Sequence, residues 1–365
     1  MAERDAQPVV CLEFFSGIGG LHYGLRESGV NASVAMSFDM NELANSVYTH
    51  NFHMRPSNKA IDYLEPRDID RHRADCWLLS PPCQPYTRGG NYRDHEDPRA
   101  RGLLHLLGLL PRLEHVPNYV LLENVMNFEN SRSRALLVEA LGRLGFEIHE
   151  CLLSPVQFGI PNNRLRYYLV AQRALPPTAA MDTASDNEAY TQAYLARGRD
   201  VVHTEWPFGP AAKSVRAADI IHYPLSGYID PAENGTESLC VPECHILKRK
   251  NLRFDIVKPD SCKTSTFTKA YGSKHLIGSG SLLQTKRLDV VEDGFGAPER
   301  LLDLGLRFFS PAEVARLHCF PTSPDMPCTL EFPSYVSQRQ RLQLLGNSLN
   351  VHVVAQLLKH VLFIQ

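Results

Sequence analysis

A cysteine, a glutamate and two arginines are the side chains of this sequence best suited to attack and polarise a substrate. Cys83 lies in the segment Pro81-Pro82-Cys83-Gln84, directly after an apolar run at residues 76–80. Prolines fix the backbone and remove N–H donors, so such a loop holds one shape around the thiol it carries. A thiol needs help to ionise at neutral pH, and its thiolate is the nucleophile. We therefore interpret Cys83 as a nucleophile presented to a substrate.

The other three residues lie near the ends of neighbouring strand patterns. Glu123 ends the next strand, and strand C-termini in a doubly wound sheet line one crevice, so Glu123 and Cys83 could converge there. A carboxyl group in such a cleft can stay protonated or hydrogen-bond to an amidine-like ring nitrogen. Arg164 and Arg166 alternate, so in an extended segment both would face the same side and suit a carbonyl oxygen or a phosphate. Each residue alone is more often structural, but their joint placement favours catalysis.

A glycine-rich segment, Phe14 to Gly20, separates the first strand pattern from the first helix pattern. Glycines let the backbone approach a ligand closely, and the helix N-terminus offers free N–H groups. Asp39 follows at about the 20-residue spacing at which an acid binds ribose hydroxyls. The spacing is G-x-G-G, not G-x-G-x-x-G, which leaves room for a nucleoside cofactor without phosphate. The alternative is a turn that serves only tight strand–helix packing, and the paired Asp39 disfavours it.

The elements that must position these residues alternate between strand and helix over the first 175 residues. This alternation predicts an α/β fold with a parallel, doubly wound, Rossmann-like sheet. We expect strands at residues 8–15, 34–38, 76–80, 119–122, 148–153 and 167–171, a first helix ending near residue 28, and further helices near 41–51, 99–115 and 132–144.

The rest of the chain has a different pattern. Pro176-Pro177 opens a polar stretch to about residue 200 that resembles a surface insertion, and an irregular Gly-, Pro- and Ser-rich region continues to about residue 304. Ser310-Pro311-Ala312-Glu313 is a capping box that predicts a helix start, and a last helix is expected at about 351–362. We therefore divide the chain into a catalytic domain (1–175), an insertion with a second, smaller lobe (176–304), and C-terminal helices that return to the catalytic domain (305–365).

Composition sets limits on the class of protein. The 365 residues are 44% hydrophobic and 21% charged with a net charge of −2, so there is no overall basic field, although a local basic face suffices for nucleic acid. The nine cysteines lack the spacing of a disulfide scaffold, and no signal peptide or membrane span is evident. We expect an intracellular protein, cytoplasmic or nuclear or both. Cys240-x-x-x-Cys244-His245 is at most half a zinc site, so no metal is predicted.

Five motifs in order make the chain resemble the S-adenosylmethionine-dependent cytosine-5 methyltransferases. They are Phe14-x-x-Gly17-x-Gly19-Gly20, Pro81-Pro82-Cys83-Gln84, Glu123-Asn124-Val125, Arg164-Leu165-Arg166 and Gly346-Asn347-Ser348-Leu349-Asn350-Val351. Within that family the chain is most similar to the DNA-methyltransferase-like tRNA enzymes that modify cytosine 38 of aspartate tRNA. The segments that carry this similarity are Pro82 to Arg88, Leu152 to Pro155, Gly159 to Asn162, and Gly346 through Ala355.

The resemblance implies a role for each motif residue. Cys83 would add to carbon 6 of cytosine, Glu123 would contact N3 and the exocyclic amine, and Arg166, with Arg164, would hold the O2 carbonyl. The residues that it implies for S-adenosylmethionine binding are Phe14, Ser16, Gly17, Ile18, Gly19, Gly20, Asp39, Met40, Ile61, Asp62, Ser80, Asn347, Ser348 and Asn350. One departure is Thr266, which replaces a cysteine that the tRNA enzymes carry in Cys-Phe-Thr.

The resemblance also implies the partner. A target base must be flipped out of its stack, at least cost for an unpaired loop base, so an anticodon-loop cytosine of tRNA is the expected substrate, with DNA at most a weak one. The basic segment Leu247 to Phe254 of the second lobe would contact nucleic acid, unless it is only a solvated helix face. A monomer without membrane contact is expected. The alternatives are a DNA cytosine-5 methyltransferase and a catalytically silent nucleic-acid-binding protein.

Overall fold

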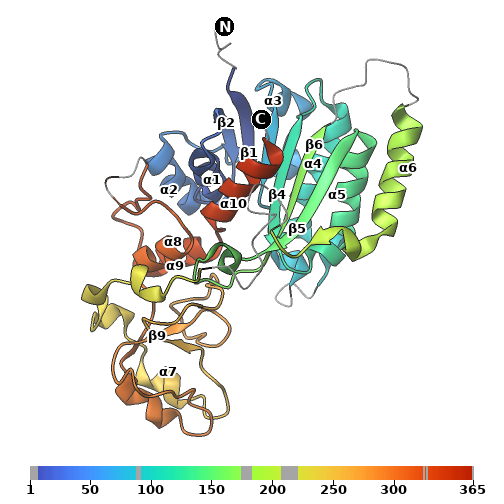
Figure 1. Cartoon of the computed structure of the whole chain (residues 1–365). Helices are drawn as coiled ribbons and strands as arrows, with labels where there is room; N and C mark the ends of the chain where they lie inside the picture. The colour runs from blue at the N-terminus through green and yellow to red at the C-terminus, as the bar shows by residue number, and fades with distance from the viewer. Residues whose placement is uncertain are drawn as a thin grey trace.

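The computed structural model describes residues 7–87, 92–173, 183–206, 221–323, 325 and 328–363. These residues form a seven-stranded sheet of order β2-β1-β3-β4-β6-β5-β7, and a smaller three-stranded sheet of order β10-β9-β8 lies in a second lobe below it (Figure 1). The strands are β1 (Val9–Phe14), β2 (Ala32–Phe38), β3 (Cys76–Leu79), β4 (Tyr119–Val125), β5 (Phe146–Leu153), β6 (Arg166–Arg173), β7 (Val202–His203), β8 (Ile256–Val257), β9 (Leu282–Gln284) and β10 (Leu306–Arg307).

The sheet confirms the predicted α/β architecture and corrects its strand directions. β1, β2, β3 and β4 are parallel, as expected, but β6 runs antiparallel to both β4 and β5. A parallel neighbour needs a long crossover, usually a helix. Residues 154–165 between β5 and β6 contain only the 3-10 helix Pro155–Phe158, so the chain turns back directly. The fully parallel sheet was therefore a wrong prediction.

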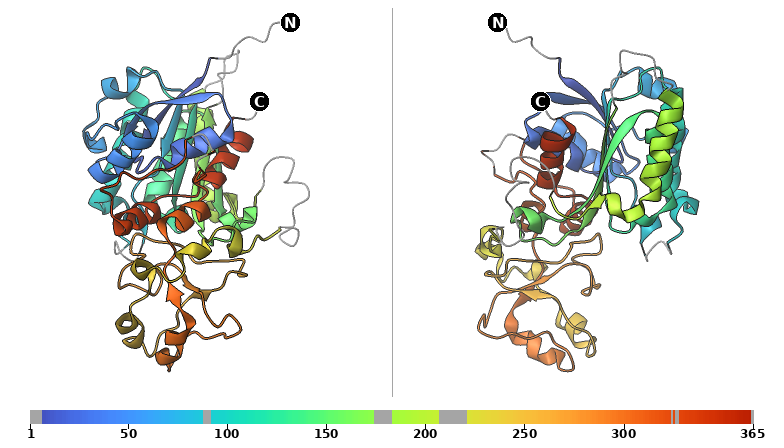
Figure 2. Two further views of the ribbon diagram at one scale, coloured as in Figure 1. Left: turned by 90° about the vertical axis from the view of Figure 1, so that its left-hand side faces the viewer. Right: turned by 45° about the vertical axis from the view of Figure 1, so that its right-hand side comes forward.

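Helices cover both faces of the large sheet, because alternate residues of each strand point to opposite sides. Leu12, Trp77 and Leu79 pack with α4 and α5, whereas Cys11 and Leu78 pack with α1 and α10 (Figures 1 and 2). The helices are α1 (Gly20–Ser28), α2 (Glu42–Phe52), α3 (Pro66–Asp70), α4 (Arg101–Leu109), α5 (Arg132–Arg143), α6 (Thr183–Ala196), α7 (Glu243–Leu247), α8 (Pro311–Leu317), α9 (Gln338–Gly346) and α10 (Val351–Leu357). No helix in the described part of the chain is long and apolar enough to cross a membrane.

Local sequence signals set several helix ends as predicted. Gly29 ends α1 with a positive φ of 70°, and Ser310 with Glu313 forms the capping box that begins α8. The last helix runs through α10 and continues as a π-helix over Leu358–Leu362, as the predicted range 351–362 requires.

The polar stretch after residue 176 contains a helix that composition did not indicate. α6 packs on α5, where Thr191 lies against Gly142 and Glu188 pairs with Arg143 at 3.3 Å. β7 then extends the large sheet by pairing with β5. The division into three parts stays a prediction. Because α6 and β7 pack on the large sheet, however, the second lobe starts after residue 203 and not at residue 176. Pro176-Pro177 and Arg88 lie outside the described residues.

The second lobe shares its apolar core with α8 and α9. Phe267, Tyr271 and Leu283 from the lobe belong to one buried cluster with Leu317 and Leu345 from these helices. Figures 1 and 2 show α8 and α9 between the lobe and the large sheet. The C-terminal segment therefore connects the two parts of the molecule and ends on the face of the sheet beside α1.

Candidate active site

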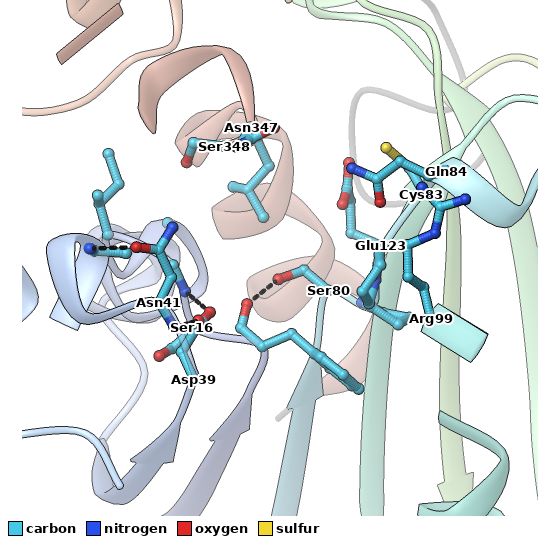
Figure 3. A pocket seen from close by; sticks show the side chains of 18 of the residues that line it. Ser16, Asp39, Asn41, Ser80, Cys83, Gln84, Arg99, Glu123, Asn347 and Ser348 are labelled. Atoms are coloured by element: carbon cyan, nitrogen blue, oxygen red, sulfur yellow. Dashed lines mark hydrogen bonds between the residues drawn. The ribbon is translucent and has the colours of Figure 1, made fainter. Parts of the chain in front are cut away.

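A cavity of about 490 Å³ lies where β1 to β4 end and the C-terminal segment returns to the sheet. Its size falls within the about 300–1,000 Å³ of small-molecule sites. The predicted site residues that line it are Ser16, Gly17, Ile18, Gly20, Asp39, Met40, Ile61, Asp62, Ser80, Cys83, Glu123, Arg164, Arg166, Asn347 and Ser348. In Figure 3, Ser16, Asp39 and Asn41 lie at one end of the cavity and Cys83, Gln84 and Glu123 at the other.

Phe14 does not reach the cavity, contrary to its predicted role. Its ring is fully buried and stacks on Phe38 with a centroid distance of 5.1 Å, on the α4 face of the sheet. Phe15 lines the cavity instead. The backbone of Phe15 has a positive φ of 58°, so the strand alternation ends there and the side chain turns toward the site.

Gly19 and Asn350 also lie outside the cavity lining and have packing roles. A Cβ on Gly19 would lie 2.3 Å from the Phe52 ring, so this glycine allows close packing against α2. The Asn350 side chain is 1% exposed, accepts a hydrogen bond from Val353 N at the start of α10, and donates one to Leu317 O. At these two motif positions the structure shows packing and capping contacts, and their predicted cofactor role stays a prediction.

Asp39 ties the glycine loop to the end of β2. Its carboxylate accepts hydrogen bonds from Gly17 N and from Asn41 N, each at 2.8 Å. Burial raises the pKa of Asp39, and these two backbone donors oppose that shift. Asn41 in turn caps α2. The acid thus holds the loop in shape while it lines the cavity.

Two features show that a ligand can fit beside this loop. Ser16 Oγ is buried and has no hydrogen-bond partner among the described residues, so it is available to a bound group. A Cβ on Gly20 would lie 2.9 Å from Ser348 Oγ, so only glycine lets the C-terminal segment close against the loop. Met40 is 63% exposed at the rim of the cavity and supplies apolar surface there.

The loop that carries Cys83 is held in place by its neighbours. Asn124 Nδ2 donates to Pro81 O at 3.2 Å, and Ser80 Oγ donates to Phe15 O at 2.9 Å. Cys83 then precedes the 3-10 helix Gln84–Tyr86 and is half-buried. Asn124 was missed as a site residue, although its place directly after Glu123 was the available signal. It positions the thiol loop by an amide contact from the next strand.

The charged groups around the Cys83 thiol have opposite effects on its pKa. Burial raises the pKa of the Cys83 thiol, and the negative charge of Glu123 raises it further, while Arg166 and Arg164 lower it. Burial also raises the pKa of Glu123, against the same two arginines. Arg166 Nε lies 3.5 Å from Glu123 Oε1. Protonation of Glu123 removes the negative charge that raises the pKa of Cys83, and leaves Arg166 and Arg164 to favour the thiolate.

Arg164 and Arg166 both line the cavity, but their partners differ. Arg164 is 2% exposed and donates to Phe267 O at 2.9 Å, to Gly346 O at 3.4 Å and to Ser348 O. Arg164 thus connects the second lobe and the C-terminal segment to the start of β6. Arg166, by contrast, faces Glu123. The idea that the pair acts together on one carbonyl is not supported by these contacts.

Arg99 is a further cavity residue that the sequence pattern did not single out. It lies on the Cys83 side of the cavity (Figure 3) and forms a two-bond pair with Asp97 at 2.8 and 2.7 Å. Asp97 also caps the short 3-10 helix Pro98–Ala100. The Asp-Pro-Arg turn was the available signal, because Asp followed by Pro is typical of a capped helix start.

Comparison with known proteins identifies the family. A family model of C-5 cytosine-specific DNA methylases matches residues 9–362. The chain belongs to this methylase family. It is 36% identical over 395 residues to the tRNA (cytosine(38)-C(5))-methyltransferase of Homo sapiens, covering 97% of this chain and 99% of that protein. It is 34% identical over 371 residues to a DNA (cytosine-5)-methyltransferase of Dictyostelium discoideum, covering 95% and 93%. The solved structure of the Dnmt2 methyltransferase of S. pombe matches with a TM-score of 0.76 and 32% identity, covering 97% of this chain and 98% of that one.

As a C-5 cytosine methylase, the chain is a methyltransferase of the S-adenosylmethionine-dependent class. Thr266, which stands where the tRNA enzymes have the cysteine of Cys-Phe-Thr, lies outside the cavity lining. Its hydroxyl donates a hydrogen bond to Asn163 O at 2.7 Å. Thr266 therefore helps to join the second lobe to the segment before Arg164. Within the described residues, no group of three or more metal-ligating side chains includes Cys240 or Cys244.

Proposed function

We propose that this methylase transfers a methyl group from S-adenosylmethionine to carbon 5 of an anticodon-loop cytosine in tRNA, at cytosine 38 of aspartate tRNA. The observation that carries the proposal is the placement of Cys83 and Glu123 at one end of a single cavity, with Ser16 of the glycine loop and Asp39 at the other. Arg166 also lines this cavity, and its Nε lies 3.5 Å from Glu123 Oε1. A nucleophile, a proton donor and a cation thus surround the space that a pyrimidine ring needs.

The cofactor end of the cavity suits a nucleoside. Asp39 and Asp62 offer carboxylate acceptors for ribose hydroxyls and an adenine amine, while Met40 and Ile61 offer apolar surface. Ser16, Ser80, Asn347 and Ser348 would border the amino acid end. When bound there, S-adenosylmethionine supplies the electrophilic methyl group that carbon 5 accepts. Gly17, Ile18 and Gly20 keep the loop close enough for this contact.

Cys83 begins the chemistry by attacking carbon 6 of cytosine. Its thiolate forms an S–C6 bond, and the electron pair of the C5=C6 bond moves onto carbon 5 and toward N3 and O2. Protonated Glu123 donates a hydrogen bond to N3, and Arg166 binds O2, so both groups stabilise the charge that addition creates. Because Asn124 and Ser80 hold the thiol loop before the base arrives, the attack requires little rearrangement.

Release of the product breaks the S–C6 bond that formed in the first step. The carbon 5 proton leaves to solvent water, its electron pair re-forms the C5=C6 bond, and the S–C6 bond breaks to return the Cys83 thiolate. Glu123 then returns to its initial state as the charge on the ring disappears. Burial of Glu123 keeps its proton available for the next cycle, because it raises the pKa of this acid.

The substrate assignment is supported by relatives and by the energetics of base access. A protein 36% identical across nearly the whole chain is named a tRNA (cytosine(38)-C(5))-methyltransferase. The cavity admits the target base only after it leaves its stack, and flipping a base out of its stack costs a few kcal/mol, least for an unpaired loop base. A DNA substrate is the second candidate, since the Dictyostelium relative is named a DNA (cytosine-5)-methyltransferase.

Methyl transfer to purified tRNA and to duplex DNA distinguishes the two substrates. We expect labelled methyl groups in tRNA, mapped to cytosine 38, and at most trace incorporation in DNA. Cys83→Ala is expected to bind S-adenosylmethionine like the wild type and to transfer no methyl group. Strong transfer to DNA with none to tRNA would contradict the substrate assignment, and transfer by Cys83→Ala would contradict the role of the thiol.

The setting of the enzyme follows from its expected substrate. All nine cysteines are free thiols, which is typical of a reducing compartment. We propose that the protein acts as a monomer in the cytoplasm, the nucleus or both. Fractionation of cells and sedimentation of the purified protein would test this.

A further inference from the structure

A second cavity of about 300 Å³ lies between the second lobe and α9, separate from the residues of the active site. We call it the lobe cavity. One wall comes from the lobe and the other from the first turns of α9. Its lining residues are Ser238, Cys240, Pro242, His245, Gly272, Ser273, Lys274, Phe308, Gln338, Arg339 and Leu342.

Among the residues that the structure describes, the lining of the lobe cavity is rich in donors and cations and includes no carboxylate. Lys274 and Arg339 are exposed, and neither side chain has an ion-pair partner within the part of the chain that the structure describes. His245 Nδ1 is buried and has no hydrogen-bond partner among those residues. The nine-residue helix α9 also begins here, with Gln338 and Arg339 in the lining. Ser337 and Gln340 form a capping box at this end, and the helix dipole adds positive potential to the cavity.

The walls of the lobe cavity are fixed by contacts within the protein. Arg249 donates hydrogen bonds to His245 O and to Lys274 O, so its guanidinium connects α7 to the turn at Lys274. Gly272 has a φ of 75°, and a Cβ there would lie 2.7 Å from Leu342 Cδ1. The lobe turn therefore approaches α9 as closely as a glycine allows. A cavity with such walls exists before any ligand binds.

α9 connects the lobe cavity to the active site. Arg339 and Leu342 line the lobe cavity, whereas Leu344 and Gly346 of the same helix line the active-site cavity. With a rise of 1.5 Å per residue, Arg339 and Gly346 are about 10 Å apart along the helix axis. A single RNA strand whose target base occupies the active site can thus place a neighbouring nucleotide at the lobe cavity.

We propose that the lobe cavity binds one nucleotide of the RNA substrate beside the flipped cytosine. Lys274 and Arg339 bind its phosphate, and the ring or ribose lies over the apolar floor of Leu342 and Phe308, which are 4% and 6% exposed. Cationic grooves with apolar or aromatic floors are typical of single-strand binding. The proposal rests on the proposed tRNA methyltransferase function and adds a second contact that holds the loop open.

The test compares charge-removing variants with a matched control. Lys274→Gln, Arg339→Gln and the double variant remove the phosphate contacts, and Lys359→Gln removes an exposed lysine near the C-terminus, away from both cavities. Binding of an aspartate tRNA transcript is measured at several salt concentrations, together with methyl-transfer kinetics and S-adenosylmethionine affinity. Thermal melting confirms that each variant is folded.

We expect each single variant to weaken tRNA binding about five- to tenfold, with a further loss in the double variant. The slope of log K against log salt should fall by about 0.7 for each lost single-strand phosphate contact. KM for tRNA should rise while kcat at saturating tRNA and cofactor affinity stay near wild type, as in Lys359→Gln. A double variant that binds tRNA within twofold of wild type, with an unchanged salt slope, would overturn the proposal.

Chemical modification of a cysteine tests whether tRNA occupies the lobe cavity, without any substitution. Cys240 lines it and is exposed, so tRNA should slow its alkylation by N-ethylmaleimide, while exposed Cys328 elsewhere should react at an unchanged rate. Equal labelling of Cys240 with and without tRNA would also refute nucleotide binding here. Failure of the wild type to methylate tRNA would instead refute the proposed function, because these binding measurements do not depend on methyl transfer.

Discussion

Arg164 and Arg166, one residue apart, are predicted to have separable roles. Arg164→Met removes a buried guanidinium that donates to the carbonyls of Phe267, Gly346 and Ser348. A net loss of about 1–1.5 kcal/mol for each of these three hydrogen bonds amounts to about 3–4.5 kcal/mol in the free energy of unfolding. At about 2 °C per kcal/mol for a chain of this size, Tm should fall by about 6–9 °C.

Arg166→Met is the matched control, because Arg166 faces Glu123 at 3.5 Å and does not connect the lobes. We expect its Tm to stay within about 2 °C of wild type and its rate of methyl transfer to fall about 10²–10³-fold, as for loss of one charge-stabilising donor. Thermal melts followed by circular dichroism and single-turnover transfer to tRNA measure both quantities. An Arg164→Met protein with wild-type Tm and a 100-fold slower chemical step would refute this division, since Arg164 would then act on the substrate.

Three further predictions concern pH and lobe contacts. The rate of methyl transfer by the wild type should depend on pH with a bell shape, because Cys83 must lose a proton and Glu123, whose pKa is raised by burial, must keep one. In Glu123→Gln the fall in rate at high pH should vanish, and the maximal rate should drop about 10²-fold. A pH series of single-turnover rates in which both proteins share the high-pH fall would contradict this. Glu13 of β1 is fully buried and accepts a hydrogen bond from the Tyr48 hydroxyl at 2.8 Å. Burial raises the pKa of Glu13 to about 8, so the stability contributed by its bound proton is present below about pH 4 and is lost as pH rises toward 8. Between pH 6 and pH 8 the free energy of unfolding of the wild type, measured in urea, should therefore fall by about 2–3 kcal/mol relative to that of Glu13→Gln. If the free energies of unfolding of the two proteins change equally with pH, a protonated Glu13 is excluded. Thr266→Val should lower the free energy of unfolding by about 1 kcal/mol, because it removes the hydrogen bond to Asn163 O. Thr266→Cys should transfer methyl groups at a rate within a few-fold of wild type. A 100-fold change in the transfer rate of either variant would show that residue 266 takes part in the chemistry.

Much of the site follows from the order of strands and loops in the sequence. Cys83 and Glu123 each come at the end of an apolar strand pattern, and parallel neighbours bring their ends to one edge of the sheet. The parallel neighbours β1 and β2 likewise end side by side, which brings Gly17 close to Asp39, and a hydrogen bond joins the two residues. These placements depend on local pattern and topology, which a sequence contains.

The misses depend on contacts between distant segments. The direction of β6 depends on a connection without a crossover helix, and the division between Phe14 and Phe15 depends on one positive φ. The role of Arg164 depends on carbonyls at Phe267 and Ser348, which lie more than 100 residues away. Periodicity does not contain such information, so an alternating Arg-x-Arg pair predicts a shared face and not separate partners.

The covalent bond between Cys83 and the target base is the central claim. A tRNA transcript with 5-fluorocytosine at position 38 lacks the carbon 5 proton that must leave, so the S–C6 bond should persist after methyl transfer. Incubation with S-adenosylmethionine, denaturing electrophoresis and mass spectrometry of the peptide that contains Cys83 would detect the adduct. We predict a one-to-one complex at Cys83 that forms with wild type and is absent from Cys83→Ala. No adduct, or one that forms equally in Cys83→Ala, would contradict the account.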